Sequence, residues 1–230
     1  MQLRTLFDGD LPALIAFDLD GTLVDSVPDL AWAIDQMLLE RNLPAAGADH
    51  VRQWVGNGSA KLVQRALVYG HRVKEEELNQ AAYQASDGLK RFKYYYGQRC
   101  CHLSCLYPGV EVALSKLHRL AIPMVVVTNK PKEYAEPILN KLKLDAYFEQ
   151  VVGGECLPKR KPDPLQLQHV LLPYGFEPSS CLMAGDSKND VLAARAAGFK
   201  VVALSYGYNH GEPIASTKPD LLIDNMNELF

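Results

Sequence analysis

The sequence has no excess of positive charge, no long apolar run and no closely spaced pair of histidines. Its net charge of −3 leaves no basic field for nucleic acid and no patch that would bind a membrane surface. The apolar runs reach about five to seven residues, whereas a membrane-spanning helix needs about 20. The six histidines form no H-x-x-x-H pair, and we find neither an internal repeat nor a low-complexity segment. We therefore expect no nucleic-acid partner and no membrane partner.

Cysteine is also scarce, with an odd count of five. Cys100, Cys101 and Cys105 form a cluster around His102, but a zinc site would need a second ligand pair at the usual spacing. We favour a helix-to-strand linker with reduced thiols, and the cluster has no assigned role. The segment Met1–Pro12 lacks the apolar core of a signal peptide, so we expect a short tail ahead of the first strand. Together these features indicate a cytoplasmic protein.

Short apolar segments that alternate with helical patterns make up most of the chain. The segments predicted as strands are Ala13–Phe17, Met124–Val127, Val151–Val152, Cys181–Ala184, Val201–Leu204 and Leu221–Ile223. Apolar strands that alternate with helices indicate a parallel sheet covered on both faces. The sequence therefore predicts an α/β fold with a doubly wound, Rossmann-like core.

A helical stretch interrupts this pattern directly after the first strand. We expect helices from Pro28, over Asp49–Val55, from an N-cap at Ser59 to Gly70, and from about Lys74 through Tyr96. This stretch is typical of a small inserted helical bundle. We predict a core of residues 1–27 and 106–230 and a helical cap domain of residues 28–105, placed where it can close over the site.

Two carboxylates, Asp18 and Asp20, follow the first strand and are two residues apart. Residues at this spacing point to the same side, so both carboxylates face one small volume that calls for a cation or a shared proton. Gly21 then lets the backbone turn sharply. Asp-Gly is a common turn and Asp-x-Asp alone is weak evidence, but the whole string from Phe17 to Ser26 is far more specific.

Three further groups of polar residues follow later strands or precede helices. Thr128 and Asn129 have a hydroxyl and an amide that can donate to phosphate oxygens, although the pair also suits a helix start. Three cations precede the helix near Leu165; they would suit a solvated turn, and Lys159 competes with Lys161 as the functional lysine.

Asp186 and Asp190 follow the strand Cys181–Ala184 and are four residues apart, so a helix starting here presents both on one side. They would suit helix caps as well. Together with Asp18 they form a hard, oxygen-rich set that suits Mg²⁺.

The string from Phe17 to Ser26 resembles the first motif of the haloacid dehalogenase superfamily of phosphotransferases. The later motifs of that family match Thr128-Asn129, Lys161-Pro162 and the segment from Gly185 to Asp190, in the same order along the chain. The dehalogenase branch lacks the second aspartate of the first motif, so the presence of Asp20 favours phosphoryl transfer.

The resemblance implies a role for each matching residue. Asp18 would be the nucleophile that becomes aspartyl-phosphate, and Asp20 the general acid and base. Thr128 would bind the transferring phosphoryl group with help from Asn129, and Lys161 would offset the charge of that group and of the nucleophile.

The implied metal is Mg²⁺. The resemblance places it on the Asp18 carboxylate, the Asp20 backbone carbonyl and the Asp186 carboxylate. Asp190 would lie outside this set or act through a water molecule.

A segment of the predicted cap, Gly56-Asn57-Gly58 followed by Arg65, resembles the cap signature of bacterial phosphoglycolate phosphatases. It would equally suit a plain helix–helix turn and a solvated helix face. The resemblance implies a small phosphorylated metabolite as the ligand, and these four residues as possible determinants of substrate choice.

Other activities of the same capped group remain open. They include hydrolysis of pyrophosphate, a sugar phosphate or a nucleotide, and phosphoryl transfer within β-phosphoglucose. A phosphonatase would need a Schiff-base lysine, for which Lys61 is the nearest candidate, with nothing nearby that obviously lowers its pKa. A catalytically idle binding module is a further alternative, which the presence of Asp18, Asp20 and Asp186 disfavours. The sequence does not indicate an oligomeric state.

Overall fold

The structure, a computed structural model, describes residues 2–73 and 82–230. The chain divides into two compact units. The first combines Met1–Asp25 with Cys105–Phe230, and the second is Ser26–Ser104. Among the described residues, no helix has both the length and the apolar character needed to cross a membrane. The interpretation of the second unit as a cap stays a prediction.

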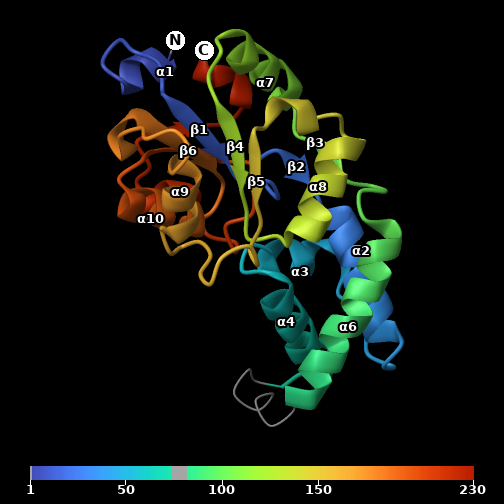
Figure 1. The fold of residues 1–230 in the computed structure, drawn as a ribbon. Helices are drawn as coiled ribbons and strands as arrows, with labels where there is room; N and C mark the ends of the chain where they lie inside the picture. The colour runs from blue at the N-terminus through green and yellow to red at the C-terminus, as the bar shows by residue number, and fades with distance from the viewer. Residues whose placement is uncertain (1, 74–81) are drawn as a thin grey trace. The chain divides into compact units, whose positions relative to one another are not determined.

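A six-stranded parallel sheet forms the centre of the first unit (Figure 1). Its order is β5-β4-β1-β6-β7-β8, with bounds β1 Leu14–Phe17, β4 Met124–Val127, β5 Gln150–Val152, β6 Cys181–Gly185, β7 Lys200–Leu204 and β8 Leu221–Ile223. The chain runs outward from β1 to β4 and β5, and then crosses to β6 on the other side of β1. This reversal makes β1 the topological switch point of the sheet, beside which such folds bind ligands. The predicted α/β fold class is confirmed.

The strand register aligns the carboxyl ends of the three central strands. Phe17 of β1 pairs with Val126 of β4 on one side and with Ala184 of β6 on the other. Residues that follow these strands therefore meet at one edge of the sheet. The register thus explains why polar side chains far apart in the sequence come together.

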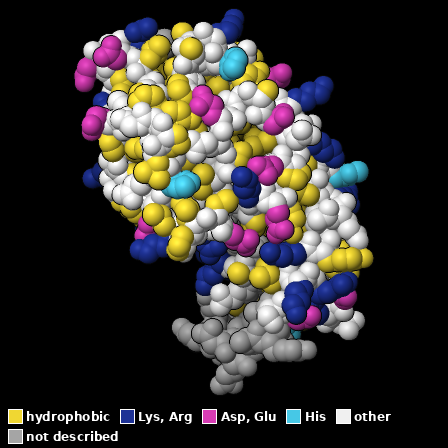
Figure 2. Space-filling view, viewed as in Figure 1, with side chains coloured by type: hydrophobic (Ala, Val, Ile, Leu, Met, Phe, Trp, Pro, Cys, Tyr) yellow, Lys and Arg dark blue, Asp and Glu magenta, His cyan; other side chains and the backbone are white. Residues whose placement is uncertain are grey.

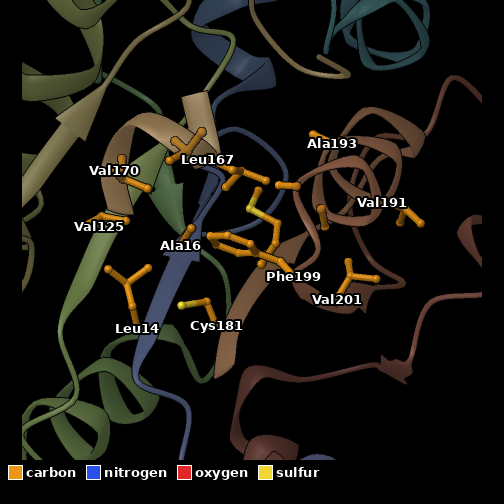
Figure 3. Close-up of a cluster of buried hydrophobic side chains, with 14 of the residues drawn as sticks. Leu14, Ala16, Val125, Leu167, Val170, Cys181, Val191, Ala193, Phe199 and Val201 are labelled. Carbon is orange, nitrogen blue, oxygen red and sulfur yellow. The ribbon is translucent and has the colours of Figure 1, made fainter. Parts of the chain in front are cut away.

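Helices cover both faces of this sheet (Figure 1). Helices α9 (Leu165–Leu171) and α10 (Lys188–Ala197) lie on one side, and α7 (Val110–Arg119) and α8 (Lys132–Lys141) on the other. Alternate strand residues such as Leu14 and Ala16 pack with Leu167 and Phe199 in a buried apolar cluster (Figure 3). Burial of both sheet faces is the reason the strands are continuously apolar.

The second unit contains the helices α2 (Val27–Leu39), α3 (Gly47–Trp54), α4 (Ser59–His71) and α6 (Ala82–Arg99). The predicted helix ends were wrong by one to three residues. The predicted helix Asp49–Val55 is α3, Gly47–Trp54, and α2 begins one residue before Pro28. Gly58 is the N-cap and Ser59 the first residue of α4, which ends one residue after Gly70, and α6 continues past Tyr96 to Arg99. The part of the fourth predicted helix between Lys74 and residue 81 lies outside the described residues.

Two short features were not predicted. The N-terminal segment is not a plain tail, because Gln2–Leu6 forms helix α1 and buries Leu3 completely. A two-stranded antiparallel ladder joins β2 (Val24–Asp25) to β3 (Cys105–Leu106), where the chain leaves the first unit and returns to it. The remaining short elements are the 3-10 turns η2 (Asp145–Tyr147), η3 (Pro178–Ser180), η4 (Ile214–Thr217) and η5 (Met226–Leu229).

Charged side chains of both signs are interspersed on the face shown in Figure 2, with apolar side chains between them. This distribution agrees with the small net charge of −3. On that face it resembles an ordinary solvated surface and not a single-sign field that would attract a polyanion.

Candidate active site

Asp18 is the first residue after β1 and lies beside a buried lysine. Its Oδ1 is 3.0 Å from Nζ of Lys161, and its side chain is 13% exposed. The same oxygen accepts a hydrogen bond from the Leu19 backbone N–H at 2.7 Å. One carboxylate oxygen is thus fixed by two donors. The carboxylate is mostly buried but is not closed off from solvent.

Lys161 is held from three sides. Its Nζ lies 2.6 Å from Oδ1 of Asp190 and donates to the backbone carbonyl of Val127 at 2.7 Å, in addition to its contact with Asp18. The side chain is 1% exposed. Burial disfavours the charged ammonium, but the carboxylates of Asp18 and Asp190 outweigh this effect and raise the pKa of Lys161. Lys161 is therefore a fixed positive charge.

Three carboxylates gather at the ends of β1 and β6. Oxygen atoms of Asp18, Asp186 and Asp190 all lie within 4.8 Å of one another. Asp190 also caps α10, since its Oδ2 accepts from both the backbone N–H and the hydroxyl of Ser187, at 2.9 and 2.7 Å. Asp190 is thus both a helix cap and a member of the acidic cluster, which the sequence offered as alternatives.

Burial shifts the pKa values of two of these acids. It raises the pKa of Asp18 from 3.8 to about 6, against the lowering effect of Lys161 and with a further contribution from Asp190. Burial, followed by the charges of Asp190 and Asp18, raises the pKa of Asp186 well above its usual range. Burial therefore disfavours the ionised form of both carboxylates more than their hydrogen-bond donors and Lys161 favour it.

Asp20 faces a different cation. Nζ of Lys130 donates to both of its carboxylate oxygens, at 3.0 and 3.1 Å. The side chain of Asp20 is 13% exposed and that of Lys130 is 4% exposed. The two aspartates of the first motif thus have different partners, since Lys161 contacts Asp18 and Lys130 contacts Asp20.

Thr128 and Asn129 follow β4, as predicted, and both are buried. The Thr128 hydroxyl accepts from the Lys130 backbone N–H at 3.2 Å. The Asn129 amide donates to the backbone carbonyl of Lys161 at 2.9 Å, so it supports the loop that contains Lys161, called here the lysine loop. Gln166 is completely buried beneath this loop, where its side chain accepts from the Lys161 N–H at 3.1 Å and donates to the Gly153 carbonyl at 2.9 Å.

Asp186 sits in a tight backbone cradle. Its Oδ1 accepts from the Thr22 hydroxyl at 2.7 Å, and its Oδ2 accepts from the Tyr208 backbone N–H at 2.6 Å. A Cβ at Gly21 would lie 2.2 Å from the Asp186 carboxylate, and one at Gly207 would lie 2.2 Å from its Cβ. Only glycine fits at these two positions unless Asp186 moves.

The charges of this site fit a divalent cation. Asp18, Asp20, Asp186 and Asp190 supply four carboxylates, whereas Lys130 and Lys161 supply two ammonium groups, so two negative charges are in excess. The donors are all oxygens, and such a hard set suits Mg²⁺.

The structure brings together every residue predicted for the core site: Asp18, Asp20, Thr128, Asn129, Lys161, Asp186 and Asp190. Four contributors were missed: Thr22, Lys130, Gln166 and the segment Tyr206–Tyr208. Lys130 had a signal, because it continues the Thr128-Asn129 turn after a buried strand. Gln166 lies five residues after Lys161, but no sequence pattern marked it, and Tyr208 is 22 residues from its partner Asp186.

The residues predicted for substrate choice lie in the second unit. The Arg65 guanidinium donates to the Trp54 carbonyl and, at 2.9 Å, to Oδ1 of Asn57. These bonds hold the Gly56–Gly58 loop against α4 and give Arg65 a structural role. A role of these residues in substrate contact stays a prediction.

The parallel sheet with a carboxylate cluster beside its switch point places this chain among the α/β proteins that hold a ligand at the carboxyl ends of their strands. More narrowly, the chain belongs to the haloacid dehalogenase-like hydrolases, since the model of that family matches residues 12–198. The resemblance inferred from the four motifs is confirmed.

Known proteins similar to the chain include close relatives over almost its full length. A phosphoglycolate phosphatase of Pseudomonas fluorescens (strain Pf0-1) is 47% identical over 98% of this chain and 81% of the relative. One of Haemophilus influenzae (strain 86-028NP) is 42% identical over 94% and 96%. A crystal structure described as a predicted phosphoglycolate phosphatase from Haemophilus somnus is 40% identical, with a TM-score of 0.87, covering 94% of this chain and 96% of its own.

Proposed function

We propose that this chain is a Mg²⁺-dependent phosphoglycolate phosphatase, which hydrolyses 2-phosphoglycolate to glycolate and phosphate. The observation that carries the proposal is the Asp18–Lys161 pair within the carboxylate cluster beside the switch point. Relatives 47% and 42% identical with that name support the choice of substrate.

In the proposed reaction the Asp18 carboxylate attacks phosphorus in line, and the bond from phosphorus to the glycolate oxygen breaks. Lys161 and Thr128 hold the equatorial phosphoryl oxygens. Asp190 and the Val127 carbonyl hold the Lys161 ammonium in place. The ammonium therefore does not have to move when negative charge develops on the phosphoryl group.

Asp20 is proposed as the general acid and base. It protonates the leaving alkoxide, and then takes a proton from the water that attacks the aspartyl-phosphate and releases phosphate. Lys130, which contacts both oxygens of Asp20, holds this carboxylate beside the reacting group. The side chain of Asp20 is thereby kept for proton transfer.

Mg²⁺ is proposed on the carboxylates of Asp18 and Asp186 and the backbone carbonyl of Asp20, with Asp190 outside this set. When bound, it supplies the positive charge that offsets repulsion between the carboxylate nucleophile and the phosphate. The excess of negative charge and the all-oxygen donor set support this assignment.

The compartment and the substrate determinants are also part of the proposal. Five free cysteines suit the reducing cytoplasm. The loop Gly56-Asn57-Gly58, together with Arg65, is proposed to influence substrate choice. A cation in that loop region suits a compact substrate with a carboxylate as well as a phosphate.

The test is phosphate release with Mg²⁺ from 2-phosphoglycolate, pyrophosphate, β-glucose 1-phosphate, 5′-nucleotides and a chromogenic aryl phosphate. We expect kcat/KM for 2-phosphoglycolate to exceed the others by about a hundredfold, which corresponds to about 2.7 kcal/mol of differential transition-state binding. Preference for another substrate would reassign the enzyme within its group, and release from none would favour a binding module.

Variants sharpen this test. Asp18→Asn removes the nucleophile and should abolish turnover, and Asp20→Ala should lower kcat by about 10²–10⁴-fold. Asp10→Asn is the matched control, because Asp10 is an exposed aspartate ahead of the sheet, and it should keep full activity. An Asp20→Ala enzyme with full activity would exclude Asp20 as the acid and base.

A further inference from the structure

The segment that follows β7, Tyr206–Tyr208, contacts Asp186 closely through its backbone. The N–H of Tyr208 donates to Oδ2 of Asp186, and Gly207 leaves no room for a side chain against the same residue. Asp186 and Tyr208 are each 2% exposed. The position of the Asp186 carboxylate therefore depends on where this segment lies.

The side chains of the same segment reach the β2–β3 ladder. The phenol of Tyr208 donates to Oδ1 of Asp25, the last residue of β2. The ring of Tyr206 packs against that of Tyr107, which directly follows β3, with 4.3 Å between centroids. The segment is thus anchored where the chain leaves the first unit and where it returns.

A second path closes the ring of contacts. The Tyr206 phenol donates to the backbone carbonyl of Thr22 at 2.7 Å, and the Thr22 hydroxyl donates to the other oxygen of Asp186 at 2.7 Å. Thr22 is completely buried. Both oxygens of Asp186 are therefore held by groups whose own positions depend on Tyr206 and Tyr208.

We propose that Tyr206 and Tyr208 are positioning residues, which orient the Asp186 carboxylate for Mg²⁺ by fastening its cradle to the β2–β3 ladder. The inference rests on the proposed function for the identity of the cation. Partners that orient a metal-binding carboxylate typically change metal affinity about 10–100-fold when they are removed. The two phenols bond to the Thr22 carbonyl and to Asp25, so each tyrosine acts on Asp186 indirectly.

The test is calorimetric titration of Mg²⁺ alone into the chelator-treated and dialysed full-length chain. Tyr208→Phe keeps the backbone N–H and the ring but loses the bond to Asp25, and we expect the Kd for Mg²⁺ to rise about tenfold. Since the defect lies in affinity, kcat for 2-phosphoglycolate should return to within about twofold of the original at saturating Mg²⁺. Tyr206→Phe should act in the same direction.

Two controls separate positioning from general destabilisation. Tyr174→Phe removes a phenol that donates to a carboxylate in the same way, at 2.6 Å to Glu149, and should leave the Kd for Mg²⁺ unchanged. Asp25→Ala should weaken binding as Tyr208→Phe does, and the double variant should bind no more weakly than the weaker single variant.

The outcomes also separate this inference from the proposed function. An unchanged Kd in Tyr208→Phe overturns the positioning role even if 2-phosphoglycolate is hydrolysed. A raised Kd supports it even if the chain prefers another phosphate ester. A chain that binds no Mg²⁺ overturns both the positioning role and the metal assignment.

Discussion

Asp18 shows how burial and charge oppose each other within one residue. Burial raises its pKa to about 6, although Lys161 lies 3.0 Å away. The lysine lowers the pKa, but burial is the larger effect, and the nearby Asp190 carboxylate adds to the rise. An added cation would favour the ionised form of this buried carboxylate.

The raised pKa of Asp18 predicts a pH dependence of stability in the chelator-treated protein. The folded state holds the Asp18 proton more tightly than the unfolded chain, so the contribution of this group is full below pH 3.8 and is lost as the pH rises through about 6. Asp18→Asn, which stays neutral, should therefore gain stability over the original chain as the pH rises from 4 to 7, on the order of 2 kcal/mol.

Thermal unfolding in chelator across this pH range measures the difference. Asp10→Asn, at an exposed site, should give no such divergence. Added Mg²⁺ should stabilise the original chain more at pH 7 than at pH 4, since it binds the ionised carboxylates. Parallel curves for Asp18→Asn and the original chain would contradict the raised pKa.

At the scale of elements, the ends of β1, β4 and β6 place the site, and short loops refine it. The register sets Phe17 beside Val126 and Ala184, so the residues just beyond each strand must converge. Helix α10 then turns Asp190 toward Lys161 through its capping box. Supporting contacts from Gln166 fix the lysine loop from beneath.

The second unit has an equally specific contact at its two ends. Asp29, in the first turn of α2, is completely buried and accepts from the backbone N–H groups of Leu103 and Ser104 and from the Ser104 hydroxyl at 2.6 Å. This carboxylate joins the beginning of the unit to its end. Asp29 therefore has a structural role in the second unit.

Asp29→Ala should lower the free energy of unfolding by about 3 kcal/mol, because several buried donors lose a charged acceptor. Urea denaturation measures the change. Asp35→Ala is the matched control: Asp35 is only half-buried and accepts from the backbone N–H groups of Ala46 and Gly47, so about 1 kcal/mol is expected. A loss below 1 kcal/mol for Asp29→Ala would show that Asp29 does not stabilise the junction between the two ends of the unit.

At the scale of the whole molecule, the chain forms two units. The first combines two separate stretches of the chain, and the second is one continuous stretch. The first depends on a long-range parallel sheet and the second on helices that follow one another in sequence. Neither unit relies on covalent cross-links, since all five cysteines are free thiols. Stability therefore comes from the buried apolar side chains.

Titration with a thiol reagent tests this statement. In the denatured protein, five thiols should react with the reagent without any reductant. In the native state Cys105 and Cys156 should react quickly, whereas Cys181 should react slowly because burial both shields it and raises its pKa. Fewer than five thiols in the denatured protein, or a Tm that falls on addition of a reductant, would indicate a disulfide.

The sequence by itself determined the fold class and the positions of the core site residues. Buried parallel strands need continuous apolar segments, and in such a sheet the residues after Phe17, Val127 and Ala184 must gather at one edge. Short-range pattern is sufficient for both conclusions. It also located the helices of the second unit among the described residues, with errors of one to three residues at their ends.

Only the tertiary structure decided which partner each carboxylate has. Lys130 contacts Asp20, Lys161 contacts Asp18, and Tyr208 lies against Asp186. The same holds for α1, whose burial of Leu3 depends on a surface made by other elements. Such pairings depend on distances between segments far apart in the chain, and packing sets these distances, whereas local sequence patterns report only which side of an element each residue occupies.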